Sequence, residues 1–246
     1  MATKPSIFSS PSRYVQGQNA INELGTYLKQ LGTNPLLLAD DTVWGLVEKP
    51  LTDGFESEDL PVNRIEFEGF ATAKRVDDLV ATIKEHDHDV VVGLGGGAAI
   101  DSAKAAGYEA GIRWASVPTA ASSDAPTSTL SVINTDKGSF DEYRFFPRNP
   151  DLVLIDTQLV AGAPEQFLIA GIGDALADAL TDLGIPIILA GFIIAVIMRV
   201  AQGSATVALT TAAGLIAPAV MAAELGGLQV AALVVAVAGR ATAGRP

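Results

Sequence analysis

The chain has 246 residues, which is enough for one large domain or two smaller ones. It contains no cysteine, which excludes disulfides, thiolate catalysis and cysteine-ligated metals. The formal net charge of −12 offers no basic surface to replace the counterions of a nucleic acid, so we expect no nucleic-acid partner. The N-terminal stretch lacks the apolar segment of a secretory signal.

The charge divides the chain into two parts. Residues 1–182 carry 27 acidic and 13 basic side chains, whereas residues 183–246 carry one acidic and three basic ones. Such an asymmetry indicates separate domains. We therefore predict one domain over residues 1–180 and a second over residues 183–246.

The first part alternates between strand-like and helix-like segments. Pro35–Asp41 is an apolar run that ends in acids, and Arg64–Phe70 alternates between apolar and polar residues. Ala71–His86 places its apolar residues on one helical face, and Asp89–Gly97 is a buried type of strand that runs into glycines. A helix and then a strand at Arg113–Thr119 follow. This order predicts an α/β fold with a mainly parallel sheet.

The glycines at the end of the predicted strand have a possible ligand. A strand that ends in Gly93, Gly95, Gly96 and Gly97 and then opens a helix exposes backbone N–H groups, which attract a pyrophosphate. The spacing differs from the usual G-x-G-x-x-G pattern of dinucleotide-binding turns. A tight turn without a ligand is the alternative interpretation.

A polar segment, Pro118–Gly138, directly follows the strand at Arg113–Thr119. It contains four serines, four threonines and Asp124. Small hydroxyls around a carboxylate at the carboxyl end of a parallel strand are typical of a ligand site in an open α/β sheet. A polar surface turn is the alternative.

Four motifs occur in an ordered series. They are "GLGGGAAIDSAKA", "PTAASSDAPTSTLSVI", "NPDLVLIDTQLVAGAP" and "AGIGDALAD". Together, over about residues 6–178, they resemble the glycerol dehydrogenases of the iron-containing alcohol dehydrogenase family. The resemblance implies an α/β dinucleotide-binding domain for NAD, followed by an all-helical domain that supplies most of a zinc site. The implied reaction is the NAD-dependent oxidation of glycerol to dihydroxyacetone.

The resemblance also implies roles for residues of the cofactor site. Asp40 would face the adenosine ribose, and Gly96 and Gly97 would hold the pyrophosphate. The residues that would line the cofactor channel are Thr119, Ser122, Ser128 and Leu130.

Two further residues receive roles from the resemblance. Asp124 would be the catalytic-site residue that contacts the glycerol hydroxyls, and Asp174 would be a zinc ligand. Asp174 could instead be a charge near a helix N-terminus. We interpret His86 and His88 as a solvated helix end rather than as ligands. Because a catalytic zinc needs about three protein ligands, we expect an incomplete metal site and an inactive enzyme.

The last part of the chain is predominantly apolar. Residues 183–201 and 205–223 are each about long enough to span the ~30 Å hydrocarbon core as a helix, although buried helices of a soluble protein are an alternative. Gly184–Val220 resembles gluconate permeases of the gluconate:proton symporter family. We predict a fusion with its seam between about Asp178 and Gly184. The protein would be membrane-associated through residues 183–223, with a cytoplasmic N-terminal domain. A transporter fragment with a soluble domain and an independent dinucleotide-binding module are the alternative functions.

Overall fold

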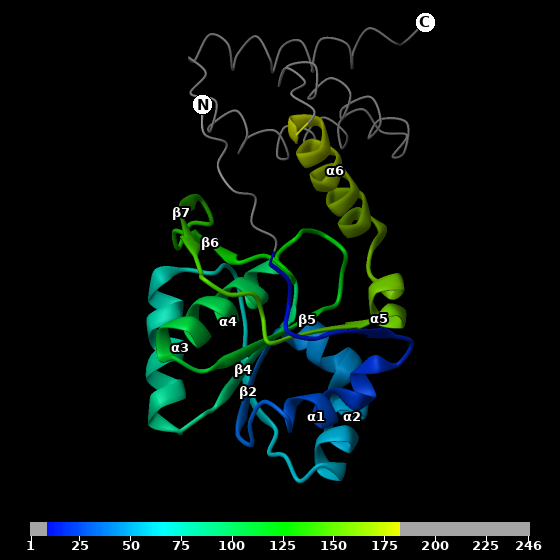
Figure 1. Ribbon diagram of the computed structural model, residues 1–246, viewed down its shortest axis with the longest axis vertical. Coiled ribbons are helices and arrows are strands. Elements are labelled where there is room, and N and C mark those ends of the chain that lie inside the picture. The colour runs from blue at the N-terminus through cyan, green and yellow to red at the C-terminus, as the bar shows by residue number, and fades with distance from the viewer. Residues whose placement is uncertain (1–8, 183–246) are drawn as a thin grey trace, which may run out of the picture. The chain divides into compact units, whose positions relative to one another are not determined.

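The computed structural model describes residues 9–182, and its ribbon is shown in Figure 1. The chain divides into two compact units, Met1–Pro164 and Glu165–Pro246. The first unit contains the sheet, and the second begins with helix α6 (Glu165–Asp182). The two predicted apolar helices at 183–201 and 205–223 lie outside the described residues.

A six-stranded sheet forms the centre of the first unit, and every neighbouring pair in it is parallel. In spatial order its strands are β1 (Tyr14–Gly17), β8 (Leu152–Asp156), β5 (Arg113–Pro118), β4 (Val90–Gly95), β2 (Pro35–Ala39) and β3 (Asn63–Glu66). The predicted α/β fold with a mainly parallel sheet is confirmed.

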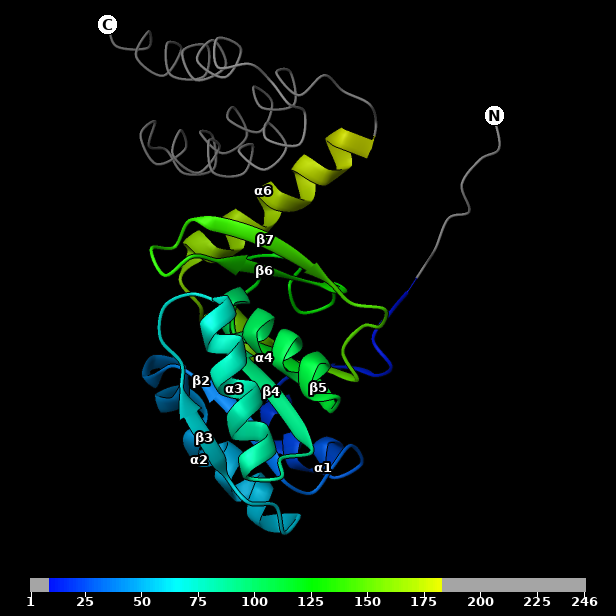
Figure 2. The same ribbon diagram turned by 90° about the vertical axis from the view of Figure 1, so that its left-hand side faces the viewer.

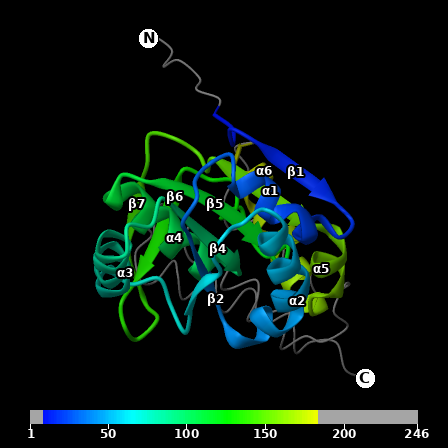
Figure 3. The same ribbon diagram turned by 90° about the horizontal axis from the view of Figure 1, so that it is seen from below.

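Helices cover both faces of the sheet (Figures 1 and 3). One face carries the 3-10 turn η1 (Ala20–Glu23), α1 (Leu24–Leu28) and α2 (Asp41–Ser57). The other face carries α3 (Ala73–Glu85) and α4 (Gly97–Ala110). A short helix, α5 (Thr157–Gly162), follows β8.

The central strands are buried on both sides because successive side chains point to opposite faces. In β5, Ala115 joins the core beneath α1 and α2, whereas Trp114 joins the core beneath α3 and α4. In β2, Leu37 likewise joins the core beneath α1 and α2, and Leu36 joins the core beneath α3 and α4. This explains why these strands read as continuous apolar runs.

Helix α3 follows directly from its sequence. Thr72 caps it by accepting a hydrogen bond from the Arg75 amide at 3.2 Å. Its predicted apolar face is confirmed, because Val76, Leu79 and Ile83 are buried.

A two-stranded antiparallel hairpin interrupts the series between β5 and β8. It consists of β6 (Leu130–Asn134) and β7 (Phe140–Phe145), and Figure 2 shows both strands next to α4. In the described part of the chain, residues 9–182, no helix has the length and apolar character needed to cross a membrane.

Candidate functional site

The turn between β4 and α4 leaves the start of the helix sterically open. Gly95 has a φ of +138°, and no side chain caps the helix at Gly96. The amide of Ile100 is bonded to Gly96 O at 3.2 Å, so the N–H groups of the preceding residues have no acceptor within the helix. A Cβ at Gly96 would meet nothing within 4 Å. The turn can therefore admit an anionic group such as a pyrophosphate.

Gly93 has a different role from the glycines of the turn. A Cβ at this position would lie 2.6 Å from the Cα of Ile100 and 2.9 Å from the carbonyl oxygen of Ala99. The missing side chain thus lets the first turn of α4 lie directly on β4. This close approach fixes the helix start at the carboxyl edge of the sheet.

Asp40 lies at the same edge, immediately after β2. Its Oδ1 accepts a hydrogen bond from the Val43 amide at 2.8 Å and caps α2. Because β2 is the neighbour of β4, Asp40 and the glycine turn share one edge. A Cβ at Gly95 would lie 3.7 Å from Val43 Cγ2, which shows how closely the two turns approach.

The hydroxyl-rich segment after β5 packs against the glycine turn. The amide of Thr119, a buried residue, donates to Gly95 O at 3.2 Å. A Cβ at Gly97 would lie 3.5 Å from Ser123 Oγ and 3.6 Å from Ala125 Cβ. The structure therefore brings Thr119, one of the predicted channel residues, and the unpredicted Ser123 and Ala125 next to the glycine turn, whereas the channel roles of Ser122, Ser128 and Leu130 stay predictions. We call the segment Thr119–Leu130 the hydroxyl loop.

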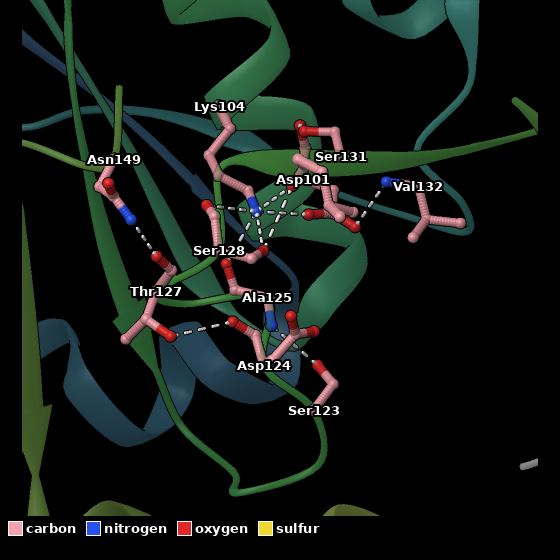
Figure 4. Close-up of polar contacts among 11 residues, drawn as sticks. Asp101, Lys104, Ser123, Asp124, Ala125, Thr127, Ser128, Ser131, Val132 and Asn149 are labelled. Carbon is pink, nitrogen blue, oxygen red and sulfur yellow. Dashed lines mark hydrogen bonds and ion pairs between the residues drawn. The ribbon is translucent and has the colours of Figure 1, made fainter. Parts of the chain in front are cut away.

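Asp124 begins a tight turn in the hydroxyl loop. Its carbonyl oxygen accepts from the amides of Thr127 at 2.9 Å and Ser128 at 3.1 Å. Asn149 Nδ2 donates to the carbonyl oxygen of Thr127 at 2.8 Å (Figure 4). The Asp124 side chain is exposed. Its contact with a substrate stays a prediction.

A buried lysine lies beneath the hydroxyl loop. Lys104 Nζ lies 3.0 Å from Asp101 Oδ1, one helical turn away in α4. It donates to the carbonyl oxygens of Ala125, at 2.8 Å, and of Leu130. It also donates to Ser128 Oγ at 3.1 Å (Figure 4). An ammonium has three protons, and here they are surrounded by acceptors of the protein itself.

Asp101 joins the same helix to β6. Its Oδ2 accepts from the Val132 amide at 3.1 Å, and its carbonyl oxygen accepts from Ser131 Oγ at 2.8 Å. The Asp101–Lys104 pair thus connects α4 to the end of the hydroxyl loop and to the strand that follows it.

Burial affects the protonation of both members of this pair. Desolvation raises the pKa of Asp101, although the Lys104 charge and the Val132 amide oppose the change. Desolvation lowers the pKa of Lys104, although the charges of Asp101 and Asp124 oppose it. The exposed carboxylate of Asp124 thus acts electrostatically on both members of the buried pair.

The sequence interpretation assigned no role to Asp101 or Lys104. A signal was present, because two opposite charges stand three residues apart in a helix of alanines and glycines, "GAAIDSAKAAGYEA". Such charges in a helix that packs on a sheet must be paired to be buried. That pairing could have been anticipated from the spacing.

The residues considered as metal ligands, Asp174, His86 and His88, do not belong to the glycine turn or the hydroxyl loop. Asp174 lies in the middle of α6, so the alternative role as a charge near a helix N-terminus is wrong. His88 is buried, with Nδ1 3.2 Å from Asn34 O, so the expected solvated helix end holds only for exposed His86. Within residues 9–182, no three His, Asp or Glu side chains are grouped to hold a metal ion. The described residues do not fit a catalytic zinc, and Asp174 stays a predicted ligand.

The sheet, the glycine turn and the hydroxyl loop give this unit the fold of a dinucleotide-binding domain. The family model of iron-containing alcohol dehydrogenase matches residues 11–157, and the chain belongs to this family. Glycolaldehyde reductase of Halobacterium salinarum is 41% identical over 172 residues, which cover 70% of this chain and 47% of the relative. Glycerol dehydrogenase of Citrobacter freundii is 42% identical over 171 residues, with the same coverage of 70% and 47%.

A solved structure supports the same assignment. The crystal structure of glycerol dehydrogenase from Schizosaccharomyces pombe is similar with a TM-score of 0.65 and 31% identity. The similarity covers 87% of this chain and 60% of that one. The chain spans about half the length of the curated relatives it matches.

A second family model matches the other part of the chain. The model of the GntP family permease matches residues 153–244. The two matches overlap in residues 153–157, at the end of the sheet. Both predicted resemblances are therefore supported. The division at 180 and 183, and the seam between Asp178 and Gly184, stay predictions.

Proposed function

We propose that the first unit is the NAD-binding part of a glycerol-dehydrogenase-type oxidoreductase. The observation that carries this proposal is the open glycine turn at the start of α4, against which the hydroxyl loop packs. The relatives named glycerol dehydrogenase support the choice of enzyme class.

Each part of the cofactor would meet a different element. The backbone N–H groups at Gly96 and Gly97 would bind the pyrophosphate, and the second carboxylate oxygen of Asp40 would accept a hydrogen bond from a ribose hydroxyl. The residues of the hydroxyl loop that would line the remaining channel are Thr119, Ser122, Ser128 and Leu130. Bound NAD supplies a hydride acceptor, and the chain's contribution is to hold and orient it.

Asp124 would orient the substrate. Its exposed carboxylate, on a turn fixed by two backbone hydrogen bonds, can accept from the hydroxyls of glycerol or of a similar small polyol. The described residues, 9–182, do not offer the ligands for a metal-dependent step.

Titration of the full chain with NAD tests the cofactor assignment. Gly97→Asp should abolish binding, because it places a carboxylate against the pyrophosphate. Gly45→Asp is the matched control, because Gly45 is exposed in α2 and a Cβ there meets nothing within 4 Å. Equal calorimetric affinity for both variants would show that the phosphate assignment is wrong.

Membrane attachment is a second candidate function, and the permease match over residues 153–244 favours it. We propose that the apolar runs at 183–201 and 205–223 attach the chain to a membrane, with the dehydrogenase part on the cytoplasmic side. An attached chain should sediment with membranes, remain there in high salt and be released by detergent. Recovery of the full chain in the supernatant without detergent would contradict this proposal.

A further inference from the structure

The hydroxyl loop has little regular structure to hold it in place. Of its 12 residues, from Thr119 to Leu130, only Leu130 belongs to a strand, as the first residue of β6, and none belongs to a helix. A segment of this kind pays a conformational entropy cost whenever it is fixed. A defined cofactor channel therefore needs contacts that hold the loop before the ligand arrives.

Lys104 provides such contacts at three places in the loop. Its ammonium bonds the carbonyl oxygen of Ala125, the hydroxyl of Ser128 and the carbonyl oxygen of Leu130. Ala125 lies within the tight turn that begins at Asp124, Ser128 closes this turn, and Leu130 follows it. One side chain thus fixes the turn and the residues after it relative to α4 (Figure 4).

The burial of Lys104 and its bonds to protein acceptors exclude a direct contact of its ammonium with a ligand. The Lys104 side chain is only 1% exposed, and its neighbours in the protein accept all of its protons. An ammonium in this position has neither a free proton for a ligand nor access to one. Asp101, which is 7% exposed, balances the charge from within the same helix.

We propose that the Asp101–Lys104 pair is a positioning device that holds the hydroxyl loop in its cofactor-binding conformation through the ammonium charge. Lys104 acts through the loop and does not touch the ligand. This inference rests on the proposed NAD-binding function, and it adds a residue pair that determines affinity from outside the channel.

Lys104→Met tests the role of charge, because methionine keeps a similar length and apolar stem. We expect the Thr127 and Ser128 amides, which bond Asp124 O, to exchange hydrogen at least about tenfold faster. NAD affinity should fall by about tenfold or more because the loop must then be ordered on binding. Peptides from β4 and α3 should exchange as in the wild type. Lys84→Met, at an exposed lysine in the last turn of α3, is the matched control.

A second variant distinguishes loss of the loop conformation from unfolding of the whole domain. Lys104→Met leaves Asp101 buried without its cation, which can destabilise the whole domain. The double variant Lys104→Met with Asp101→Asn removes both charges and retains an acceptor for the Val132 amide. It should fold with the wild-type exchange pattern in the sheet and still show the fast loop and the weakened NAD affinity.

The pH profile supplies a readout that packing alone would not change. Wild-type NAD affinity should fall as the pH rises towards the pKa of Lys104, which burial lowers and which Asp101 and Asp124 raise. The double variant has no ammonium to lose at this position, so it should lack this fall.

The possible results separate this inference from the proposed function. Wild-type exchange or wild-type affinity in Lys104→Met would overturn the inference, because packing would then suffice. Global unfolding of the double variant would also overturn it, because the pair would then be a general folding element. If the wild type binds no NAD, the proposed function fails, whereas loop exchange still decides whether Lys104 holds the loop.

Discussion

Asp40 combines a structural task with a predicted binding task. Its Oδ1 caps α2 through the Val43 amide, and the remaining oxygen is the atom proposed to accept from the ribose. The effect of Asp40 on stability can therefore be separated from its effect on NAD binding. A carboxylate at a helix start is also favoured by the partial positive charge there.

Two substitutions of Asp40 should separate these tasks. Asp40→Ala should lower the free energy of unfolding by about 1 kcal/mol, because the cap is lost, and should also weaken NAD binding. Asp40→Asn should keep the cap and most of the stability, yet still weaken NAD binding. Denaturant unfolding and calorimetry on the full chain would measure the two effects. Wild-type NAD affinity in Asp40→Asn would contradict the ribose assignment.

The sequence predicted a glycine turn at the start of α4, but it did not predict which glycine faces open space and which allows the helix to pack on the strand. Gly96 and Gly97 were expected to face a pyrophosphate, and the structure leaves open space at Gly96. The role of Gly93 depends on the distance between β4 and α4. Such a distance is a property of packing, which no local pattern contains.

At the scale of elements, the sequence pattern predicted helix α3 and the strands β2, β3, β4 and β5, but β1 and α2 received no prediction. Helix α2 contains Gly45, Pro50 and Gly54, all of which disfavour a helix interior. Its apolar positions Val43, Val47, Leu51 and Phe55 are nevertheless buried at a spacing of four residues. Tertiary burial of this stripe outweighs the poor local propensity.

The Asp101–Lys104 pair was missed for a related reason. Each residue alone is a common helix-surface residue, and only the fold places the loop and β6 over them. The glycines and hydroxyls of the sequence thus indicated where the candidate site lies, and its ligand contacts stay predictions. The contacts that hold its shape required the long-range arrangement.

The buried pair should leave a specific signature in the pH dependence of stability. Burial raises the pKa of Asp101 in the folded state, so its stabilising contribution is present below pH 3.8 and is lost as the pH rises through the folded-state pKa. Burial lowers the pKa of Lys104, so stability is regained as the pH rises through that pKa towards 10.5. Wild-type stability relative to the double variant should therefore be lowest between these two pKa values.

Denaturant titrations of both proteins, followed by the fluorescence of buried Trp114, would measure this difference. At neutral pH the double variant should be at least as stable as the wild type, since apolar or neutral replacements of a buried ion pair are often neutral or stabilising. A wild-type advantage that is largest at neutral pH would show that the ion pair stabilises the fold itself.

At the scale of the whole molecule, the elements proposed to bind NAD do not by themselves make a complete catalytic centre. The described residues hold the elements proposed to bind NAD, but they include no group of three metal-binding side chains. The resemblance assigns one ligand, Asp174, to a different compact unit. Cofactor binding and turnover should therefore be separable in this chain.

We expect the full chain to bind NAD and to oxidise no glycerol, with or without added zinc. One carboxylate cannot hold a catalytic metal, because such sites use about three protein ligands. The measurement is NADH formation at 340 nm with excess glycerol. Turnover that disappears in Asp174→Asn would contradict the expectation and would show that a working metal site exists.

The order of strands in the sheet also limits how a gene of this kind can be rearranged. The first strand, β1, lies at one edge and pairs only with β8, whose last residue is Asp156. A recombination break placed before β8 would leave β1 and β5 without the strand between them. A break placed after Asp156 would preserve every strand pairing. The predicted seam between about Asp178 and Gly184 meets this condition, whereas a break at residue 153, where the permease match begins, would fall inside β8 and remove the pairing partner of β1.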